Sequence, residues 1–158
     1  MRITSLQSPA AVHSGHGGGL PPVRRVLAAV TVPARVEAVP GLRRLARVAT
    51  DGADVSAEAR EALAVIVTEL ATNVVLHSGS SDLSVVFELC DTALTVRVRD
   101  GGRWRERSAP RCEPADVDAV FGRGLSLVRA FAAHTSVLRT AGGTVVEAVI
   151  ARGPAVPG

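Results

Sequence analysis

The sequence predicts a single α+β domain, a two-layer sandwich in which a mixed, mostly antiparallel sheet is covered by helices on one face. Two pairs of strand-like runs, at residues 82–100 and 135–150, predict the sheet, since paired runs joined by short turns form hairpins. In the first pair, apolar residues alternate with polar ones, which predicts two strands with one solvated face. Runs with apolar residues at helical spacing predict the helices. A chain of 158 residues with 47% hydrophobic content suits one substantial core and leaves little room for a second domain.

The first part of the chain predicts a tail, an edge strand and a helix. Residues 1–22 are polar and rich in Gly and Pro, so we expect a disordered tail before a domain that spans residues 23–151. A short apolar run, Val26 to Val32, predicts an edge strand, and a helix is expected from Pro40. Solvation explains the basic face of that helix most simply, and docking of a partner is the alternative; the face consists of Arg43, Arg44 and Arg47.

A longer amphipathic helix is predicted after Ser56, a residue type that often caps helix N-termini. Its apolar stripe runs over about five turns and consists of Leu63, Ile66, Val67, Leu70 and Val74. Glu69 and Asn73 are one turn apart, so both side chains point the same way from the flank of this stripe. A carboxylate and a carboxamide in that position predict the wall of a pocket, and a pair that is merely solvated is the simpler alternative.

The C-terminal half predicts a loop, a helix and a hairpin. Residues 103–120 combine mixed charge with two prolines, as a long mobile loop would. An amphipathic helix follows Gly122 and Gly124 at once, and a glycine turn joins the two final strands. Residues 152–158 are expected to form a flexible C-terminal tail.

Composition excludes several classes of function. All 18 basic residues are Arg, so neither a P-loop lysine nor a Schiff-base lysine is present. The net charge of +3, without aromatic platforms, argues against direct nucleic-acid binding. No run approaches the ~18 apolar residues of a membrane span, and the N-terminus lacks a signal-peptide core, so we expect a cytoplasmic protein without membrane contact.

The cysteines and histidines predict no site. Cys90 and Cys112 lie outside any disulfide-like or metal-like spacing, so we expect reduced thiols. His77 falls on the packed stripe and is expected to be structural, and His134 is expected to cap the end of the last helix.

Four separated motifs carry groups that together suit a nucleotide: ELATN at 69–73, RDGG at 99–102, FGRGL at 121–125 and GGT at 142–144. Asp100 ends a strand before two glycines, which exposes its carboxylate to an adenine-like amine while Gly102 lets the backbone come close. Taken alone, an Asp-Gly pair is more often a simple turn. Gly122 and Gly124 leave backbone N–H groups at a helix start, where the helix dipole favours phosphate by only ~0.3–1 kcal/mol.

Such a weak contribution implies that a divalent cation does much of the neutralisation of the phosphates. Asn73 would supply an oxygen ligand to Mg²⁺, which takes few protein ligands beside phosphates and waters. Glu69, one turn away, would orient or deprotonate a hydroxyl near the terminal phosphate. The four motifs in this order favour a nucleotide site over four unrelated features.

On these motifs the chain resembles the GHKL superfamily of Bergerat-fold ATPases over residues 23–151, and within it the bacterial anti-sigma factor serine/threonine kinases. The resemblance implies a Bergerat fold that binds ATP or ADP with Mg²⁺, and a lid between the two glycine motifs. It assigns Glu69 as the base, Asn73 as the Mg²⁺ ligand and Asp100 as the residue that binds adenine. Further nucleotide contacts are implied for the remaining motif positions: Gly102, Gly122, Arg123, Gly124, Leu125 and Thr144.

The same resemblance implies a homodimer that binds a sigma factor and phosphorylates a serine of a small STAS-type anti-anti-sigma antagonist. One departure concerns Trp104, which occupies the last position of a pattern that usually reads Asp-x-Gly-x-Gly. Without Lys, cationic contacts to phosphate fall to Arg, with Arg103, Arg105, Arg107 and Arg123 as candidates. Two alternatives remain open: a nucleotide-gated binding module without phosphoryl transfer, and a detached histidine-kinase catalytic domain.

Overall fold

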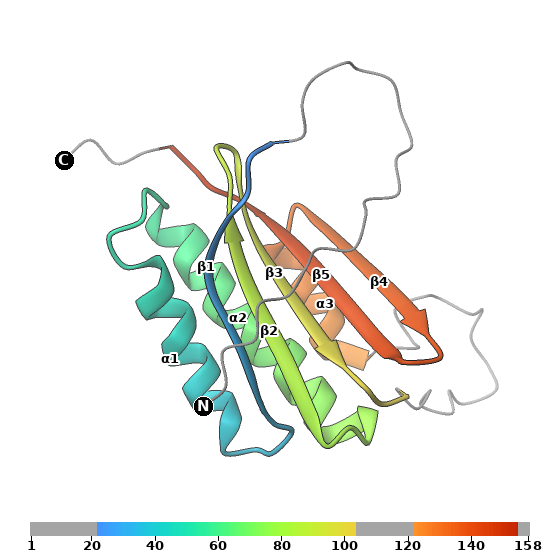
Figure 1. Cartoon of the computed structure of the whole chain (residues 1–158). Helices are drawn as coiled ribbons and strands as arrows, with labels where there is room; N and C mark the ends of the chain where they lie inside the picture. The colour runs from blue at the N-terminus through green and yellow to red at the C-terminus, as the bar shows by residue number, and fades with distance from the viewer. Residues whose placement is uncertain (1–21, 104–121, 155–158) are drawn as a thin grey trace.

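The computed structural model describes residues 22–103 and 122–154, which form a two-layer α+β sandwich (Figure 1). This confirms the predicted fold class. The predicted N-terminal tail up to residue 21, the loop residues 104–121 with Trp104, and residues 155–158 lie outside the described part. The elements are β1 Arg25–Pro33, α1 Ala38–Thr50, α2 Ala57–Asn73, the π-helical turn η1 Val74–Ser78, β2 Asp82–Leu89, β3 Ala93–Asp100, α3 Gly122–Phe131, β4 His134–Thr140 and β5 Gly143–Ala151.

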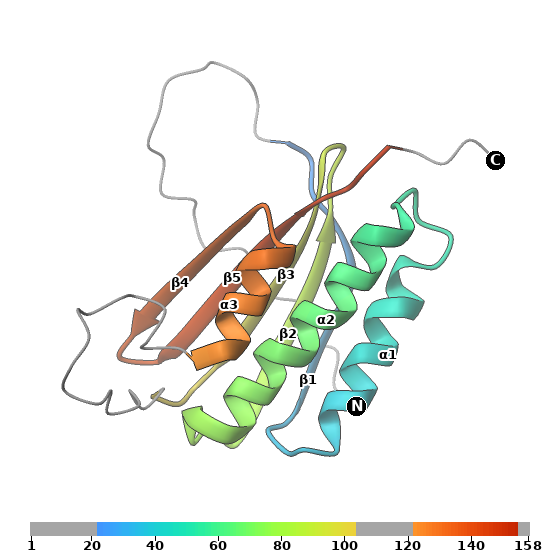
Figure 2. The ribbon, with the colours of Figure 1, turned by 180° about the vertical axis from the view of Figure 1, so that it is seen from behind.

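The five described strands form one sheet in the order β1-β2-β3-β5-β4. Each of the four pairings is antiparallel, so the described sheet is antiparallel throughout rather than mixed. Figures 1 and 2 show that α1, α2 and α3 all lie on the same face of this sheet. Because β3 is central, its end lies between β2 on one side and β5 on the other.

Helix α2 is the central element of the helical layer, since it contacts α1, α3, β3 and β5. It begins after Ser56, whose hydroxyl accepts a hydrogen bond from the backbone N–H of Ala59 at 3.2 Å, as predicted for an N-cap. The predicted apolar stripe is buried along its whole length. Each large apolar side chain buried in this way contributes about 1.5–3 kcal/mol, and those on the stripe are Leu63, Ile66, Val67, Leu70 and Val74.

The other face of the sheet carries polar side chains, as the alternation in β2 and β3 predicted. Arg97 lies between Glu88 and Glu147, with nitrogen–oxygen distances of 3.4 and 2.8 Å. Thr95 departs from the expectation of a solvated face, because it is buried. The cross-strand register places Thr95 beside Glu88 and Val149, so its neighbours share in covering it.

Two local expectations are corrected. Helix α1 begins at Ala38, two positions before Pro40. His134 does not cap a helix, because α3 ends at Phe131 and His134 is an exposed residue at the start of β4. Its backbone instead pairs with Val149.

Arg152, one residue past the predicted end of the domain, ties three segments together. Its guanidinium donates to the backbone and side chain of Asp54 and, at 3.2 Å, to the carbonyl oxygen of Asp91. Its own carbonyl accepts from the N–H of Ser56 at 3.1 Å. Separately, none of the helices in the described ranges has the length and apolar character needed to cross a bilayer.

Candidate functional site

The end of α2 carries the two polar residues that were predicted to face a pocket. Asn73 is 7% exposed, and Glu69, one turn earlier, is half-buried. The side-chain nitrogen of Asn73 is buried and has no hydrogen-bond partner among the described residues. A buried amide group without a partner costs about 1–3 kcal/mol. A ligand that offers a hydrogen-bond partner to the Asn73 side chain would therefore bind more favourably.

Helix α2 continues into the π-helical turn η1, which Gly79 ends with a left-handed backbone conformation at φ 69°. Such turns are rare and occur frequently at functional sites. The hydroxyl of Ser78 donates to the carbonyl oxygen of Val74 at 2.8 Å and accepts from the N–H of Ser80 at 3.1 Å. These bonds satisfy polar groups at the helix end and fix the path of the chain toward β2.

The turn after β3 packs directly against this helix end. Asp100 is 3% exposed, and its Oδ1 accepts from the N–H of Gly102 at 2.9 Å. The N–H of Gly101 donates to the hydroxyl of Ser80 at 3.0 Å. A Cβ atom at Gly102 would lie 2.0 Å from the carbonyl oxygen of Ser78, so only glycine permits this approach of the two backbones.

The start of β5 closes the other side of Asp100. Thr144 is the direct cross-strand partner of Asp100 and is 2% exposed. Gly143 has a φ of 125°, and a Cβ atom there would lie 1.9 Å from the carbonyl oxygen of Asp100. The register of β3 and β5 thus brings the GGT motif against the RDGG motif.

The start of α3 lies at the same end of the sandwich. Figures 1 and 2 place it there together with the end of α2, the end of β3 and the turn between β4 and β5. Leu125 and Val128 anchor α3, because both side chains are buried in the core and the helix packs on α2. The phosphate contacts predicted for Gly122, Arg123 and Gly124 stay a prediction.

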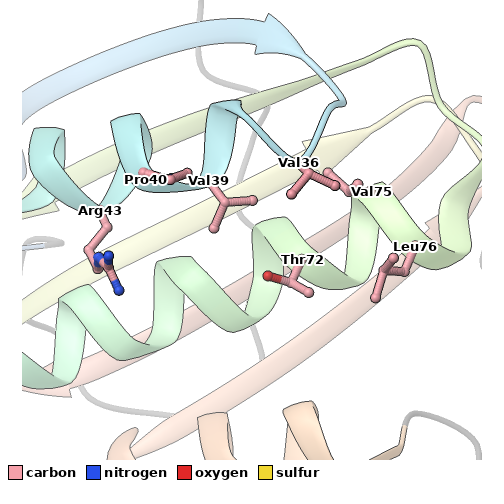
Figure 3. A pocket seen from close by; sticks show the side chains of 7 residues that line it. All are labelled: Val36, Val39, Pro40, Arg43, Thr72, Val75 and Leu76. Carbon is pink, nitrogen blue, oxygen red and sulfur yellow. The ribbon is translucent and has the colours of Figure 1, made fainter.

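An apolar groove lies beside this end, between α1 and α2 (Figure 3). It has a volume of about 370 Å³. Val36, 65% exposed, and Leu76, 62% exposed, are among its walls, so exposed apolar side chains gather here. Among the described residues of the lining, Arg43 is the one that carries a charge, and the other members are Val39, Pro40, Thr72 and Val75.

Comparison with models of known families matches residues 32–150 to the histidine kinase-like ATPase domain. The chain belongs to the histidine kinase-like ATPase family. The matched range includes all four motifs and every described element except most of β1 and the last residue of β5. The resemblance to GHKL ATPases predicted from ELATN, RDGG, FGRGL and GGT is thereby confirmed, and membership of this ATPase family implies nucleotide binding.

Among solved structures, this ATPase domain is similar to the crystal structure of the RsbU and RsbW domains of Rv1364c from Mycobacterium tuberculosis. The TM-score is 0.61 at 18% sequence identity, so the similarity concerns the fold. The match covers 81% of this chain and 34% of that one. No curated protein sequence matches this chain.

The structure therefore joins two of the four motifs, RDGG and GGT, by strand pairing, and the segment that follows ELATN, from Ser78 to Ser80, packs on RDGG. Sequence analysis missed Ser78, Ser80 and the close approach of Gly143 to Asp100. The run HSGSS, which places small polar residues between a long helix and a strand, was the available signal for the two serines. It does not identify their partners, since Gly101 lies 21 residues further along the chain.

Proposed function

We propose that this chain is an ATP-dependent protein-serine kinase and anti-sigma factor. In this proposal it binds a sigma factor and transfers the γ-phosphoryl group of ATP to a serine of a small STAS-type antagonist. The observation that carries the proposal is the buried side-chain nitrogen of Asn73, which has no hydrogen-bond partner among the described residues. It lies at the end of α2, within the matched ATPase range and one turn from Glu69.

The residues present fit a nucleotide with a divalent cation. A carboxamide nitrogen and oxygen are assigned from their hydrogen bonds, and none among the described residues fixes the nitrogen of Asn73, so the side chain can present its oxygen there equally well. Amide oxygens are ligands that Mg²⁺ accepts. Bound Mg·ATP would supply the transferable phosphoryl group and the charge that neutralises it. Asn73 would hold the cation, and the backbone from Gly122 to Leu125, with Arg123, would contact phosphate.

Asp100 and Thr144 suit recognition of adenine. An ionised carboxylate only accepts hydrogen bonds, and the exocyclic amine of adenine donates them. The hydroxyl of Thr144 can donate or accept beside it. Both side chains are almost fully buried and directly opposite each other in the sheet, so their positions are set by the strand register rather than by solvent-exposed rotamers. Gly102 supports the pair, since its N–H holds one oxygen of the Asp100 carboxylate.

Glu69 is proposed as the base that orients, or accepts the proton of, the substrate serine hydroxyl. Its place one turn before Asn73 puts both side chains on one side of α2. Partial burial limits competing water, which strengthens a hydrogen bond to an incoming hydroxyl.

The groove between α1 and α2 supports the binding of a protein partner. Exposed apolar surface in a hollow is typical of protein interaction sites, and the groove between α1 and α2 provides it. Thr72 in this groove immediately precedes Asn73, so a protein seated there would lie beside the nucleotide. The RsbU domain that accompanies an RsbW domain in Rv1364c fits a regulatory setting for such domains. The implied homodimer stays a prediction.

The test of nucleotide binding is Asn73→Ala, measured by calorimetry with Mg·ATP. We expect binding to be lost while the thermal midpoint stays the same or rises, because the substitution removes a buried polar group that lacks a partner. Thr72→Ala, one position earlier and directed into the groove, is the matched control and should bind normally. Unaltered Mg·ATP affinity in folded Asn73→Ala would refute the metal-ligand role.

The test of phosphoryl transfer is Glu69→Gln, which keeps the shape of the side chain and removes the base. Purified STAS-type proteins from the same organism are incubated singly with γ-labelled ATP. We expect wild-type protein and the control Glu61→Gln, an exposed position on the same helix, to label one of them. Glu69→Gln should bind Mg·ATP but label it about 10²-fold more slowly. Binding by wild type without labelling of any antagonist would favour a nucleotide-gated binding module.

A further inference from the structure

The hydroxyl of Ser80 links the connection between η1 and β2 to the turn after β3. It accepts from the N–H of Gly101 at 3.0 Å and donates to the carbonyl oxygen of Asp82 at 2.7 Å. Ser80 itself follows η1, and its N–H donates to the hydroxyl of Ser78 at 3.1 Å. The end of η1, the start of β2 and the turn after β3 therefore meet at one residue.

The bond to Gly101 acts on the peptide unit that directly follows Asp100. A peptide unit is planar, so holding its N–H also sets the direction of the Asp100 carbonyl. That carbonyl packs on Gly143, where a Cβ atom would lie 1.9 Å from its oxygen. Ser80 thus holds the N–H of the Asp100–Gly101 peptide, and Gly143 of β5 restricts the position of its carbonyl oxygen. Rotation of this peptide would shift Gly101 and, with it, the N–H of Gly102 that holds the Asp100 carboxylate.

We propose that Ser80 is a positioning residue for adenine recognition and acts through Asp100. This inference rests on the proposed function, in which Asp100 accepts a hydrogen bond from the exocyclic amine of adenine. Ser80 does not contact the nucleotide in this scheme. It fixes the peptide after Asp100, and the N–H of Gly102 then fixes the carboxylate at 2.9 Å.

A positioning role can be separated from a purely structural one at this residue. The hydrogen bond between Gly101 and Ser80 lies at an exposed position, so water can replace the hydroxyl when it is removed. The domain should therefore stay almost as stable without it. The peptide after Asp100 would lose its fixed direction, because a mobile water defines a direction less well than a side chain held by Asp82 does.

The experiment measures ADP and IDP affinity by calorimetry, with Mg²⁺, for wild type and Ser80→Ala. Hypoxanthine carries a carbonyl oxygen where adenine carries its amine, so IDP lacks the group that Asp100 is proposed to bind. We expect Ser80→Ala to weaken ADP binding about 3- to 10-fold, the range for one hydrogen bond. IDP affinity should change less than about twofold, and the thermal midpoint should fall by less than about 3 °C.

Two further variants sharpen the result. Ser80→Thr keeps the hydroxyl and should restore the wild-type preference for ADP. Ser81→Ala is the matched control, because the hydroxyl of Ser81 lies 3.5 Å from the side chain of Asp82 at the exposed surface. Among the described residues it makes no hydrogen bond to the turn after β3. It should leave both affinities unchanged.

An unchanged ratio of ADP to IDP affinity in folded Ser80→Ala would overturn the inference. Equal loss of both affinities together with a lower thermal midpoint would also overturn it, since that pattern indicates a structural role alone. If wild-type protein binds neither nucleotide, the proposed function itself fails and the inference falls with it. Binding by wild type therefore separates the two failures.

Discussion

Replacing Gly102 by alanine should destabilise the domain, and replacing its neighbour Gly101 should not. A Cβ atom at Gly102 would lie 2.0 Å from the carbonyl oxygen of Ser78 and 2.9 Å from the nitrogen of Ser80, both backbone atoms that cannot turn aside. At Gly101 the nearest atom is the Ser80 hydroxyl at 3.6 Å, an ordinary contact. Neither glycine has a positive φ, so the contact alone distinguishes the two positions.

The expected size of the effect follows from overpacking, which costs about 1–3 kcal/mol when the structure can shift to relieve it. At roughly 4 °C per kcal/mol for a domain of this size, Gly102→Ala should lower the thermal midpoint by about 4–12 °C. Gly101→Ala should be neutral or raise stability by about 0.4–1 kcal/mol, because alanine restricts the unfolded chain.

Thermal and urea unfolding of both variants measure this difference, with ADP calorimetry on the same samples. We expect Gly102→Ala to weaken ADP binding as well, since relief of the clash must move either η1 or the turn that carries Asp100. Equal stability of the two variants would refute the reasoning, because it would mean that the end of α2 and the turn after β3 do not approach this closely.

The remaining predictions concern β5 and the turn between β2 and β3. Gly143→Ala should lower the free energy of unfolding in urea by about 1–3 kcal/mol, because its φ of 125° is strained for alanine and a Cβ atom would meet the carbonyl at the end of β3. Gly142→Ala is the control and should cost less, since the nearest contact of a Cβ atom there is 3.7 Å away. Equal losses in the two variants would contradict the close packing of Gly143 on Asp100. At Cys90, burial acts to raise the thiol pKa, but hydrogen bonds from Thr92 and its neighbours lower it on balance. Thr92→Val, made in a Cys112→Ser background, should raise the pKa of Cys90 and reduce its thiolate fraction at pH 7, so alkylation should slow by about threefold. A pH–rate profile identical to that of the Cys112→Ser protein would count against the hydrogen bond from the Thr92 side chain.

Most of the fold could be predicted from the sequence, because the features that specify it are local. Apolar spacing identified α2 and its N-cap at Ser56, and alternation identified β2 and β3. Boundaries were less accurate where local signals compete: α1 begins before Pro40, and His134 enters β4 instead of capping a helix. The residues around His134 suit the end of a helix and the start of a strand equally well in sequence. Only the pairing with β5 decides that they begin β4.

The candidate site, like the fold, could be predicted only in part from the sequence. The sequence by itself determined which residue types are available, since ELATN places a carboxylate and a carboxamide one turn apart and RDGG places a carboxylate before two glycines. It also determined the order of the motifs, which indicated the family. What it did not determine is which backbone atoms meet.

Only the tertiary structure decided that Ser80 binds the N–H of Gly101 and that Gly143 packs on the carbonyl of Asp100. These contacts join residues 21 and 43 positions apart, so no local pattern encodes them. They follow from the antiparallel register, in which Asp100 faces Leu83 on one side and Thr144 on the other. The register in turn is fixed by burying the apolar faces of β2, β3 and β5 at once, because a shift by one residue would turn those faces to solvent.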